Sequence, residues 1–329
     1  MTSNETSGRS AVSWWAWAAL GVVYVVWGST YLAIRFLVES APPLLGASAR
    51  FLVGGLVLAL LVLLISGPRG MRMTKAQFGT AALVGVLLPA VGNGLVTVAE
   101  QYVASGLAAL LVACVPLYVV VLRLALGERP SAVTVVGVAV GLGGLAVLVL
   151  GGGGEATGTH GSAWWAPWLV LLAAFGWSVG SVATTRLPVP PNPFALSAVE
   201  MIVGGLVLAV SGWARGERID VGAISTSSWL AFAYLALVGS VFAFSAYVYV
   251  LGVLPVSTVS TYAYVNPVIA VLLGVVVADE RFDTRQLVGG LLVVLAVVLV
   301  VSAERRRGRS RPAPEVSVEA GTITESCRR

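Results

Sequence analysis

The sequence predicts an all-α integral membrane protein with ten transmembrane helices, arranged as two inverted five-helix repeats. The chain has 329 residues, of which 58% are hydrophobic and 11% are charged. Soluble globular domains carry about 25% charged residues, so this composition points to a membrane protein. The apolar residues form runs of roughly 20 residues, the length that a helix needs to cross a bilayer. Short motifs also recur about 150 residues apart.

The first apolar run, 14–34, is predicted to be a retained transmembrane span. It is longer than the apolar core of about 7 to 15 residues that a secretory signal peptide carries. The other nine spans are predicted at 44–65, 76–98, 103–123, 131–150, 163–185, 193–213, 228–250, 255–278 and 284–302.

The distribution of basic residues predicts that both termini are cytoplasmic. With ten spans the termini share one side, and that side holds fourteen Lys and Arg residues against five on the other. Positive charge is retained on the cytoplasmic side, so we expect a multi-pass protein of the plasma (inner) membrane. Half of the fourteen lie in the C-terminal tail, whose basic cluster would contact membrane lipid.

Motif pairs divide the chain into two halves. The sequence VGGLVLA occurs at 53–59 and again at 203–209, an offset of 150, and Trp27 matches Trp177 at the same offset. Because five spans is an odd number, the halves would sit in opposite orientations, as in many carriers. The predicted divisions are an N-terminal tail 1–13, a first repeat 14–150, a Gly-rich linker 151–162, a second repeat 163–303 and a basic, disordered tail 304–329.

Several motifs in order resemble the paired EamA domains of the drug/metabolite transporter superfamily, in its YedA-like branch. They are WGSTYLAIR at 27–35, ARF at 49–51, GNGLVTVAE at 92–100 and YAYVNP at 262–267. The resemblance covers roughly residues 14–303. It implies a ten-span inner-membrane carrier that exports small metabolites or amino acids through a central cavity between the halves.

The ninth predicted span carries the strongest candidate for substrate contact. Thr258, Tyr262 and Asn266 follow at intervals of four residues, which would align them on one helix face. That face is costly in lipid, so it should point inward and line the cavity. The alternative is hydrogen bonding between helices. Proline interrupts helical hydrogen bonding, and the predicted helix breaks are at Pro89, Pro116 and Pro267.

Further cavity candidates lie in other spans. Asn93 falls between two glycines in the third span, and its alternative role is a polar brace beside a proline kink. The nearby Glu100 is interpreted as an interfacial, solvated carboxylate rather than as the alternative, a buried proton carrier. The aromatic candidates in the first and sixth spans, which could instead be packing residues, are Trp27, Tyr31 and Trp177.

Arg50 and Glu200 are ionisable residues predicted inside spans, which makes them functional candidates. Arg50 could bind an anionic substrate group, and Glu200 an amine or a coupled proton. Snorkelling or a bond to a neighbouring helix are the alternatives. Whether the two residues meet is left open.

Other features exclude whole function classes. The chain has two cysteines and one histidine, so neither a disulfide framework, a metal site nor a histidine-based catalytic set is expected. No phosphate-binding loop of the ATPase type occurs, so no nucleotide or other cofactor is predicted. Nucleic-acid binding is not expected. Gly137 and Gly141 form a GxxxG motif, which could mark a homodimer face but more simply allows close packing within the bundle.

The predicted function is a secondary transporter, not an enzyme, and its direction as an exporter rests on the resemblance alone. Its expected partner is a small-molecule substrate, with a coupled proton as a further candidate. The alternatives are a channel-like or scaffold membrane protein without coupled transport. An intramembrane enzyme is disfavoured because paired catalytic acids or a nucleophile with a base are lacking.

Overall fold

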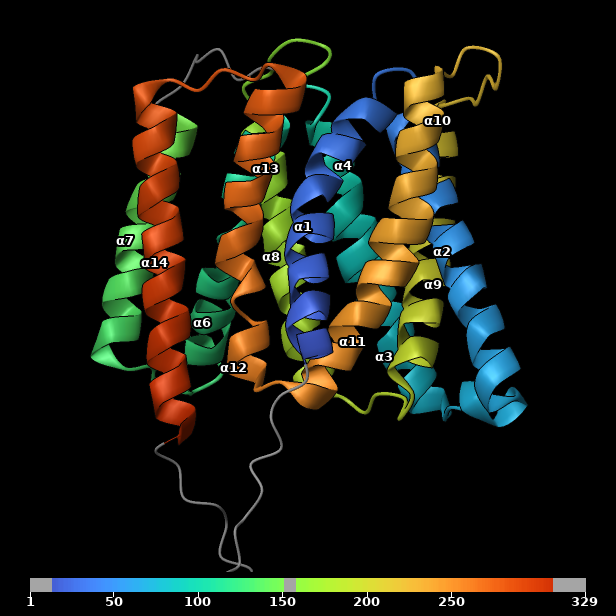
Figure 1. The fold of residues 1–329 in the computed structure, drawn as a ribbon, viewed down its shortest axis with the longest axis horizontal. Coiled ribbons are helices and arrows are strands. Elements are labelled where there is room, and N and C mark those ends of the chain that lie inside the picture. The colour runs from blue at the N-terminus through green and yellow to red at the C-terminus, as the bar shows by residue number, and fades with distance from the viewer. Residues whose placement is uncertain (1–13, 151–157, 310–329) are drawn as a thin grey trace, which may run out of the picture.

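The computed structural model describes residues 14–150 and 158–309, which form a bundle of long helices standing side by side (Figure 1). Helix α1 (Trp14–Leu37) begins, and helix α14 (Thr284–Arg309) ends, at the same end of the bundle, at the bottom of Figure 1. We call this the termini end and the opposite one the distal end. By length and composition, nine helical segments of the described chain can cross a membrane, and Tyr262–Ala278 is a shorter apolar helix. The all-α membrane class predicted from the sequence is therefore confirmed.

The first half contains a regular succession of helices. Its third span is divided into α3, η2 and α4, and its fourth span into α5 and α6. After α1 its elements are α2 (Pro43–Ser66), the short 3₁₀-helix η1 (Pro68–Met71), α3 (Lys75–Gly85), the π-helix η2 (Val86–Asn93), α4 (Gly94–Ala99), α5 (Ser105–Val112), α6 (Val115–Ala125) and α7 (Ala132–Leu150).

Apart from η1, the described second half has the same order of elements, including a π-helix in its third helical segment. Before α14 it consists of α8 (Ala166–Arg186), α9 (Pro193–Ala214), α10 (Thr226–Ala233), the π-helix η3 (Tyr234–Phe242), α11 (Ala243–Val253), α12 (Val256–Val259) and α13 (Tyr262–Ala278).

Side-chain caps start several of these helices. Thr74 and Gln77 form a reciprocal capping box at the start of α3. The Asn192 side chain accepts hydrogen bonds from the amides of Phe194 and Ala195 at the start of α9. Such caps satisfy amide groups that have no partner within the helix, and they fix where each span begins.

The two interrupted spans break beside hydroxyl or small residues, and proline marks only one of the breaks. In the fourth span the break falls at residues 113–114, and Pro116 lies in the first turn of α6. In the ninth span the break falls at Ser260 and Thr261, whereas Pro267 lies inside α13. Pro89 lies within η2. The break in the ninth span therefore precedes the proline that was expected to cause it.

Helices from the two halves pack against each other in a crossed pattern. Helix α1 packs against η3, α11 and α13 of the second half, and α8 packs against η2, α4 and α6 of the first. Helix α2 lies along α9, and α7 lies along α14. Gly137 faces α14, and Gly141 faces Leu117 of α6 and Ala296 of α14, which is the packing role rather than evidence of a dimer face.

Candidate functional site

An aromatic cluster joins α1 to the second half near the start of α13. The ring centroids of Trp27 and Tyr247 are 4.9 Å apart, those of Trp27 and Tyr262 are 5.2 Å apart, and those of Tyr247 and Tyr262 are 5.8 Å apart. The two contacts that Tyr262 makes are edge-to-face, the arrangement that aromatic quadrupoles favour. The structure thus brings together two of the predicted cavity residues and adds Tyr247, which the sequence analysis had missed.

Hydrogen bonds hold this cluster in place. The Trp27 indole Nε1 donates to the carbonyl oxygen of Gly239, which lies in the π-helix η3, at 3.3 Å. The hydroxyl groups of Tyr24 and Thr261 are hydrogen bonded to each other across the helix break. A π-helix and a helix break both alter the usual backbone pairing, so polar side chains of α1 find partners in both places.

Asn266 braces α1 against α13. Its side-chain amide donates to the carbonyl oxygens of Tyr24 and Tyr262, each at 3.2 Å. The helices approach closely here, because a Cβ atom at Gly28 would lie 2.9 Å from Ile269. Asn266 is buried, so its geometry matches the helix–helix bonding that was weighed as the alternative to cavity lining.

Thr258 lies apart from Tyr262 and Asn266. The helix break separates α12 from α13, so the expected continuous face of three residues does not exist. The Thr258 hydroxyl instead accepts a hydrogen bond from Arg305 of α14 at 3.3 Å. The i, i+4 spacing was misleading here because it assumes an unbroken helix.

The first half has a related but less polar arrangement around Trp177. This residue packs on η2, where a Cβ atom at Gly92 would lie 2.8 Å from the Trp177 ring. Asn93, the next residue, is half-buried, and its backbone carbonyl accepts a hydrogen bond from the Thr97 hydroxyl at 2.8 Å. Each half therefore offers its π-helix to the tryptophan on the first helix of the other half.

Arg50 and Glu200 do not form an ion pair. Arg50 is buried, its Nε donates to the Ser240 hydroxyl at 3.3 Å, and its guanidinium lies 4.8 Å from the centre of the Phe51 ring. Glu200 is half-buried on α9, where its backbone closely approaches Gly85 of α3. The charged neighbour that interacts electrostatically with Arg50 is Glu100.

A buried ion pair lies at the distal end. Arg35, at the end of α1, donates to Glu280 at 3.0 Å, and the Glu280 side chain is only 1% exposed. The same carboxylate accepts hydrogen bonds from the amide and hydroxyl of Ser105, both at 2.8 Å, and from the amide of Gly106 at 3.0 Å. It thereby caps the N-terminus of α5, where a negative charge is favourable. Asp279, in the left-handed conformation with φ 50°, ends α13 and aims Glu280 inward.

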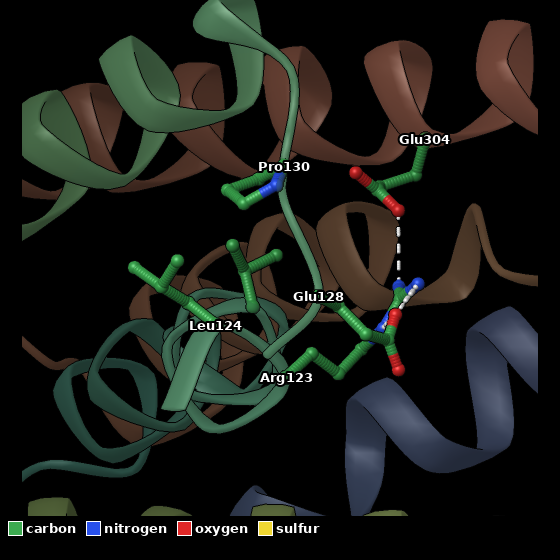
Figure 2. Close-up of a pocket in the computed structure, with 6 residues that line it drawn as sticks. Arg123, Leu124, Glu128, Pro130 and Glu304 are labelled. Atoms are coloured by element: carbon green, nitrogen blue, oxygen red, sulfur yellow. Dashed lines mark hydrogen bonds and ion pairs between the residues drawn. The ribbon is translucent and has the colours of Figure 1, made fainter. Parts of the chain in front are cut away.

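An exposed charge cluster occupies the termini end (Figure 2). Arg123 binds Glu128 at 2.6 Å and Glu304 at 3.0 Å, and Arg186 binds Glu128 at 2.6 Å. Bonding to Arg123 and Arg186 holds the pKa of Glu128 below its ordinary value. A shallow pocket here is lined by Val120, Arg123, Leu124, Glu128, Pro130 and Glu304, none of which was predicted as a cavity residue.

Glu100 contradicts its interpretation as a solvated carboxylate. It follows α4 at the distal end, is 0% exposed, and neither carboxylate oxygen has a hydrogen-bond partner among the described residues. A helix-end position suggested solvent, but the side chain is fully buried and interacts electrostatically with Arg35, Arg50 and Glu280 from other parts of the chain.

Sequence reasoning thus missed five residues, which are Arg35, Glu280, Arg186 and Glu128 at the two ends and Tyr247 in the aromatic cluster. The four residues at the ends were not among the predicted site residues, and the two arginines entered only the count of basic residues on each side. The signal was available: Arg35 and Arg186 lie 151 residues apart, and the two glutamates lie 152 apart. No group of three or more His, Cys, Asp or Glu that could hold a metal occurs in residues 14–150 and 158–309.

The profile of the EamA-like transporter family matches the chain twice, over residues 13–150 and 164–302. The inner membrane transporter YedA of Escherichia coli (strain K12), which is described as uncharacterized, is 40% identical over 284 residues, covering 86% of this chain and 89% of YedA. A protein named "Probable terminal-alkyne amino-acid exporter" from Streptantibioticus cattleyicolor is 28% identical, covering 90% of this chain and 95% of its own.

A crystal structure of a protein with 21% sequence identity aligns with a TM-score of 0.59, covering 89% of this chain and 98% of that one, which shows a shared fold. Taken with the many apolar helices, these matches show that the chain is a multi-pass membrane protein that belongs to the EamA-like transporter family.

Proposed function

We propose that the protein is a secondary transporter that exports a small metabolite or amino acid across the plasma membrane by alternating access. The observation that carries this proposal is a pair of related ion pairs at opposite ends of the bundle. One joins Arg35 to Glu280 at the distal end, and the other joins Arg186 to Glu128 at the termini end. Transport between two sides requires a gate at each end, and these pairs have the required positions.

Each ion pair connects the two halves of the molecule. Arg35 ends the first helix of the first half, and Glu280 follows the fourth span of the second half. Arg186 ends the first helix of the second half, and Glu128 follows the fourth span of the first half. In each pair, an arginine from one half binds a glutamate from the other half. Two inverted five-span repeats would produce this arrangement if α12 and α13 together form the ninth of ten spans. It supports the division into repeats 14–150 and 163–303.

The two ends differ in how tightly they are closed. The side chains of Arg35 and Glu280 are 17% and 1% exposed, whereas those of Arg186 and Glu128 are 44% and 40% exposed. In an inverted-repeat carrier the second state would exchange these roles, so Glu128 would become buried as Glu280 is now. With cytoplasmic termini, the arrangement described here is the state closed to the outside.

The aromatic cluster of Trp27, Tyr247 and Tyr262 is the proposed recognition surface. Its residues come from both halves, next to the break between α12 and α13 and beside η3. Irregular backbone at membrane depth supplies polar groups for small substrates in carriers. The name of the relative from Streptantibioticus cattleyicolor suggests amino acids as the first class to test.

Counterflow in proteoliposomes tests the proposal with the full chain. Vesicles loaded with one unlabelled amino acid from a panel should accumulate the same labelled amino acid transiently. Tyr262→Ala should reduce this exchange by roughly 2- to 10-fold, since an aromatic contact contributes about 0.5–1.5 kcal/mol. Tyr249→Ala is the matched control, because Tyr249 lies nearby on α11 but is 44% exposed. An equal effect of both changes would remove the cluster from the site.

Counterflow also separates the alternatives. A channel would give flux that does not saturate and shows no counterflow, and a scaffold would give neither. The family assignment disfavours an enzyme. The amino-acid panel with and without a proton gradient identifies both the substrate class and the driving ion.

A further inference from the structure

Glu100 is a fully buried carboxylate whose position the proposed gates do not explain. It sits between the spans Lys75–Ala99 and Ser105–Ala125, at 0% exposure. Both of its carboxylate oxygens lack a hydrogen-bond partner within the described part of the chain. An ionised carboxylate in such a place is costly, because burial removes its water without replacing the lost hydrogen bonds.

Charged or titratable residues from three parts of the chain interact electrostatically with Glu100. Arg35 and Tyr31 on α1, Arg50 on α2 and Glu280 after α13 all interact with it electrostatically. Burial raises the pKa of Glu100, the Glu280 carboxylate raises it further, and Arg35 and Arg50 oppose the rise. In the segment after Glu100, the rings of Tyr102 and His160 lie beside each other with centroids 6.2 Å apart, and the His160 amide donates to the carbonyl of Gln101.

Arg35 lies near two carboxylates at this end, those of Glu100 and Glu280, and it forms its ion pair with Glu280. Glu280 also holds the N-terminus of α5, whose first residue is only five positions after Glu100. A neutral Glu100 leaves Arg35 to Glu280. An ionised Glu100 would compete with Glu280 for Arg35 or would need to be hydrated. Either change would weaken the Arg35–Glu280 contact at the closed distal end.

We propose that Glu100 is a proton-binding site whose protonation is required to close the distal end over the Arg35–Glu280 pair. This inference rests on the proposed function for its role in transport, but not for its chemistry. When the distal end is open, the carboxylate takes a proton from water on that side. When the end closes, the acid is buried as the neutral form, and reopening allows the proton to leave to water again.

The pH dependence has a definite sign. An acid that is harder to ionise in the closed state than in the open state stabilises closure at low pH. This stabilisation is lost as the pH rises toward the pKa of the buried acid. Between the pKa of the exposed acid in the open state and that of the buried acid in the closed state, the ratio of closed to open protein falls about tenfold for each pH unit.

Infrared spectroscopy of the full-length protein tests whether the acid is neutral. At neutral pH the wild-type protein should show a carbonyl band of a protonated, buried carboxylic acid, and Glu100→Gln should remove it. Glu39→Gln is the matched control, because Glu39 lies at the same end but is exposed. A spectrum in which Glu100→Gln removes no such band would overturn the proposal.

Hydrogen–deuterium exchange tests whether the proton controls closure, and it needs no substrate. The amides of Ser105 and Gly106 are bonded to Glu280 only while the distal end is closed. At alkaline pD, segment 104–107 should exchange faster in the wild type than in Glu100→Gln measured under the same conditions. Equal exchange in the two proteins overturns the proposal, even if the infrared band is lost.

A second variant keeps the test decisive if Glu100→Gln does not fold. Glu100→Asp retains an acid on a shorter side chain, so the pD at which segment 104–107 begins to exchange should shift rather than disappear. An unshifted midpoint would contradict the proposal. Absence of counterflow with intact infrared and exchange effects would refute the proposed function alone. Counterflow with no effect of Glu100 in either measurement would refute the proton site alone.

Discussion

The distal end and the termini end use the same two residue types in related positions, yet they differ in structure. At the distal end Glu280 is buried and accepts four hydrogen bonds from Arg35, Ser105 and Gly106. At the termini end Glu128 is exposed and binds two arginines. Within the described residues it does not cap α12, the helix that takes the place of α5 in the second half. The comparison shows that the same pair can be a closed contact or a surface contact, depending on whether a helix N-terminus is seated beneath it.

The largest expected effect comes from removing the buried carboxylate. Glu280→Gln leaves Arg35 without its partner and weakens the cap of α5, and breaking a buried pair costs about 3–5 kcal/mol. Thermal unfolding in detergent measures the loss. Glu128→Gln is the matched control and should cost little, since exposed ion pairs contribute weakly in water. Equal losses would mean that the two ends are equivalent and that the distal end is not specially closed.

A smaller effect is expected where the duplicated VGGLVLA motif meets different surroundings. A Cβ atom at Gly204 would lie 2.5 Å from the carbonyl oxygen of Gly85 and 2.7 Å from Pro89, whereas one at Gly54 would lie 3.1 Å from the Ser240 side chain. Gly204→Ala should therefore destabilise by about 1–3 kcal/mol through overpacking. Gly54→Ala should cost less in the same melting experiment. A reversed order would contradict the asymmetry between the halves.

The two repeat-related tryptophans offer a third comparison. Trp27 donates a hydrogen bond to Gly239, and no such bond is described for the indole of Trp177. Trp27→Phe should lose about 0.5–1.5 kcal/mol more than Trp177→Phe, because a carbonyl in η3 would be left without that donor. Unfolding in detergent at a fixed lipid content compares them. A larger loss for Trp177→Phe would indicate that ring packing on Gly92 outweighs the hydrogen bond.

The smallest effect concerns pH and salt at the termini end. Its arginines hold the pKa of Glu128 below the ordinary value of 4.5. A carboxyl group with a lowered pKa in the folded state contributes stability above that ordinary value and loses it as the pH falls through the folded pKa. Acidification below pH 4.5 should therefore slightly lower the melting temperature of the wild type relative to Glu128→Gln. Added salt should remove the difference by screening the exposed pair, and a salt-independent difference would contradict its surface character.

Much of the fold was predictable because a membrane span requires a long run of apolar residues, which is easily recognised in a sequence. Apolar runs predicted the helices, and recurring motifs such as those around Trp27 and Trp177 predicted two similar halves. The exact break in the ninth span was not predictable from Pro267. The helix continues through this proline and breaks at Ser260 and Thr261, where hydroxyl groups find other partners.

The candidate site was predictable in its residue types but only partly in its groupings. Tyr262 and Trp27 do meet, whereas Thr258 and Asn266 lie in different contacts. Periodicity describes one helix at a time, but Glu100, Glu280 and Tyr247 acquire their roles from contacts between helices distant in the sequence. Glu100 in particular lies at a helix end that looks exposed in the sequence, yet it is buried near Arg35, Arg50 and Glu280, which are distant in the sequence.

The π-helices carry a consequence for evolution and for protein engineering. Each bonds residues five apart instead of four, so it holds one residue more than an α-helix does over the same turn. In a regular α-helix one added residue would rotate everything after it by roughly 100° about the helix axis, since an α-helix has 3.6 residues per turn, and the wider π-helical turn absorbs that rotation. Deleting one residue within Tyr234–Phe242 would therefore restore regular winding while Tyr247 keeps the side that meets Trp27 and Tyr262. What such a deletion would change is the backbone pairing of η3, including the Gly239 carbonyl to which Trp27 donates.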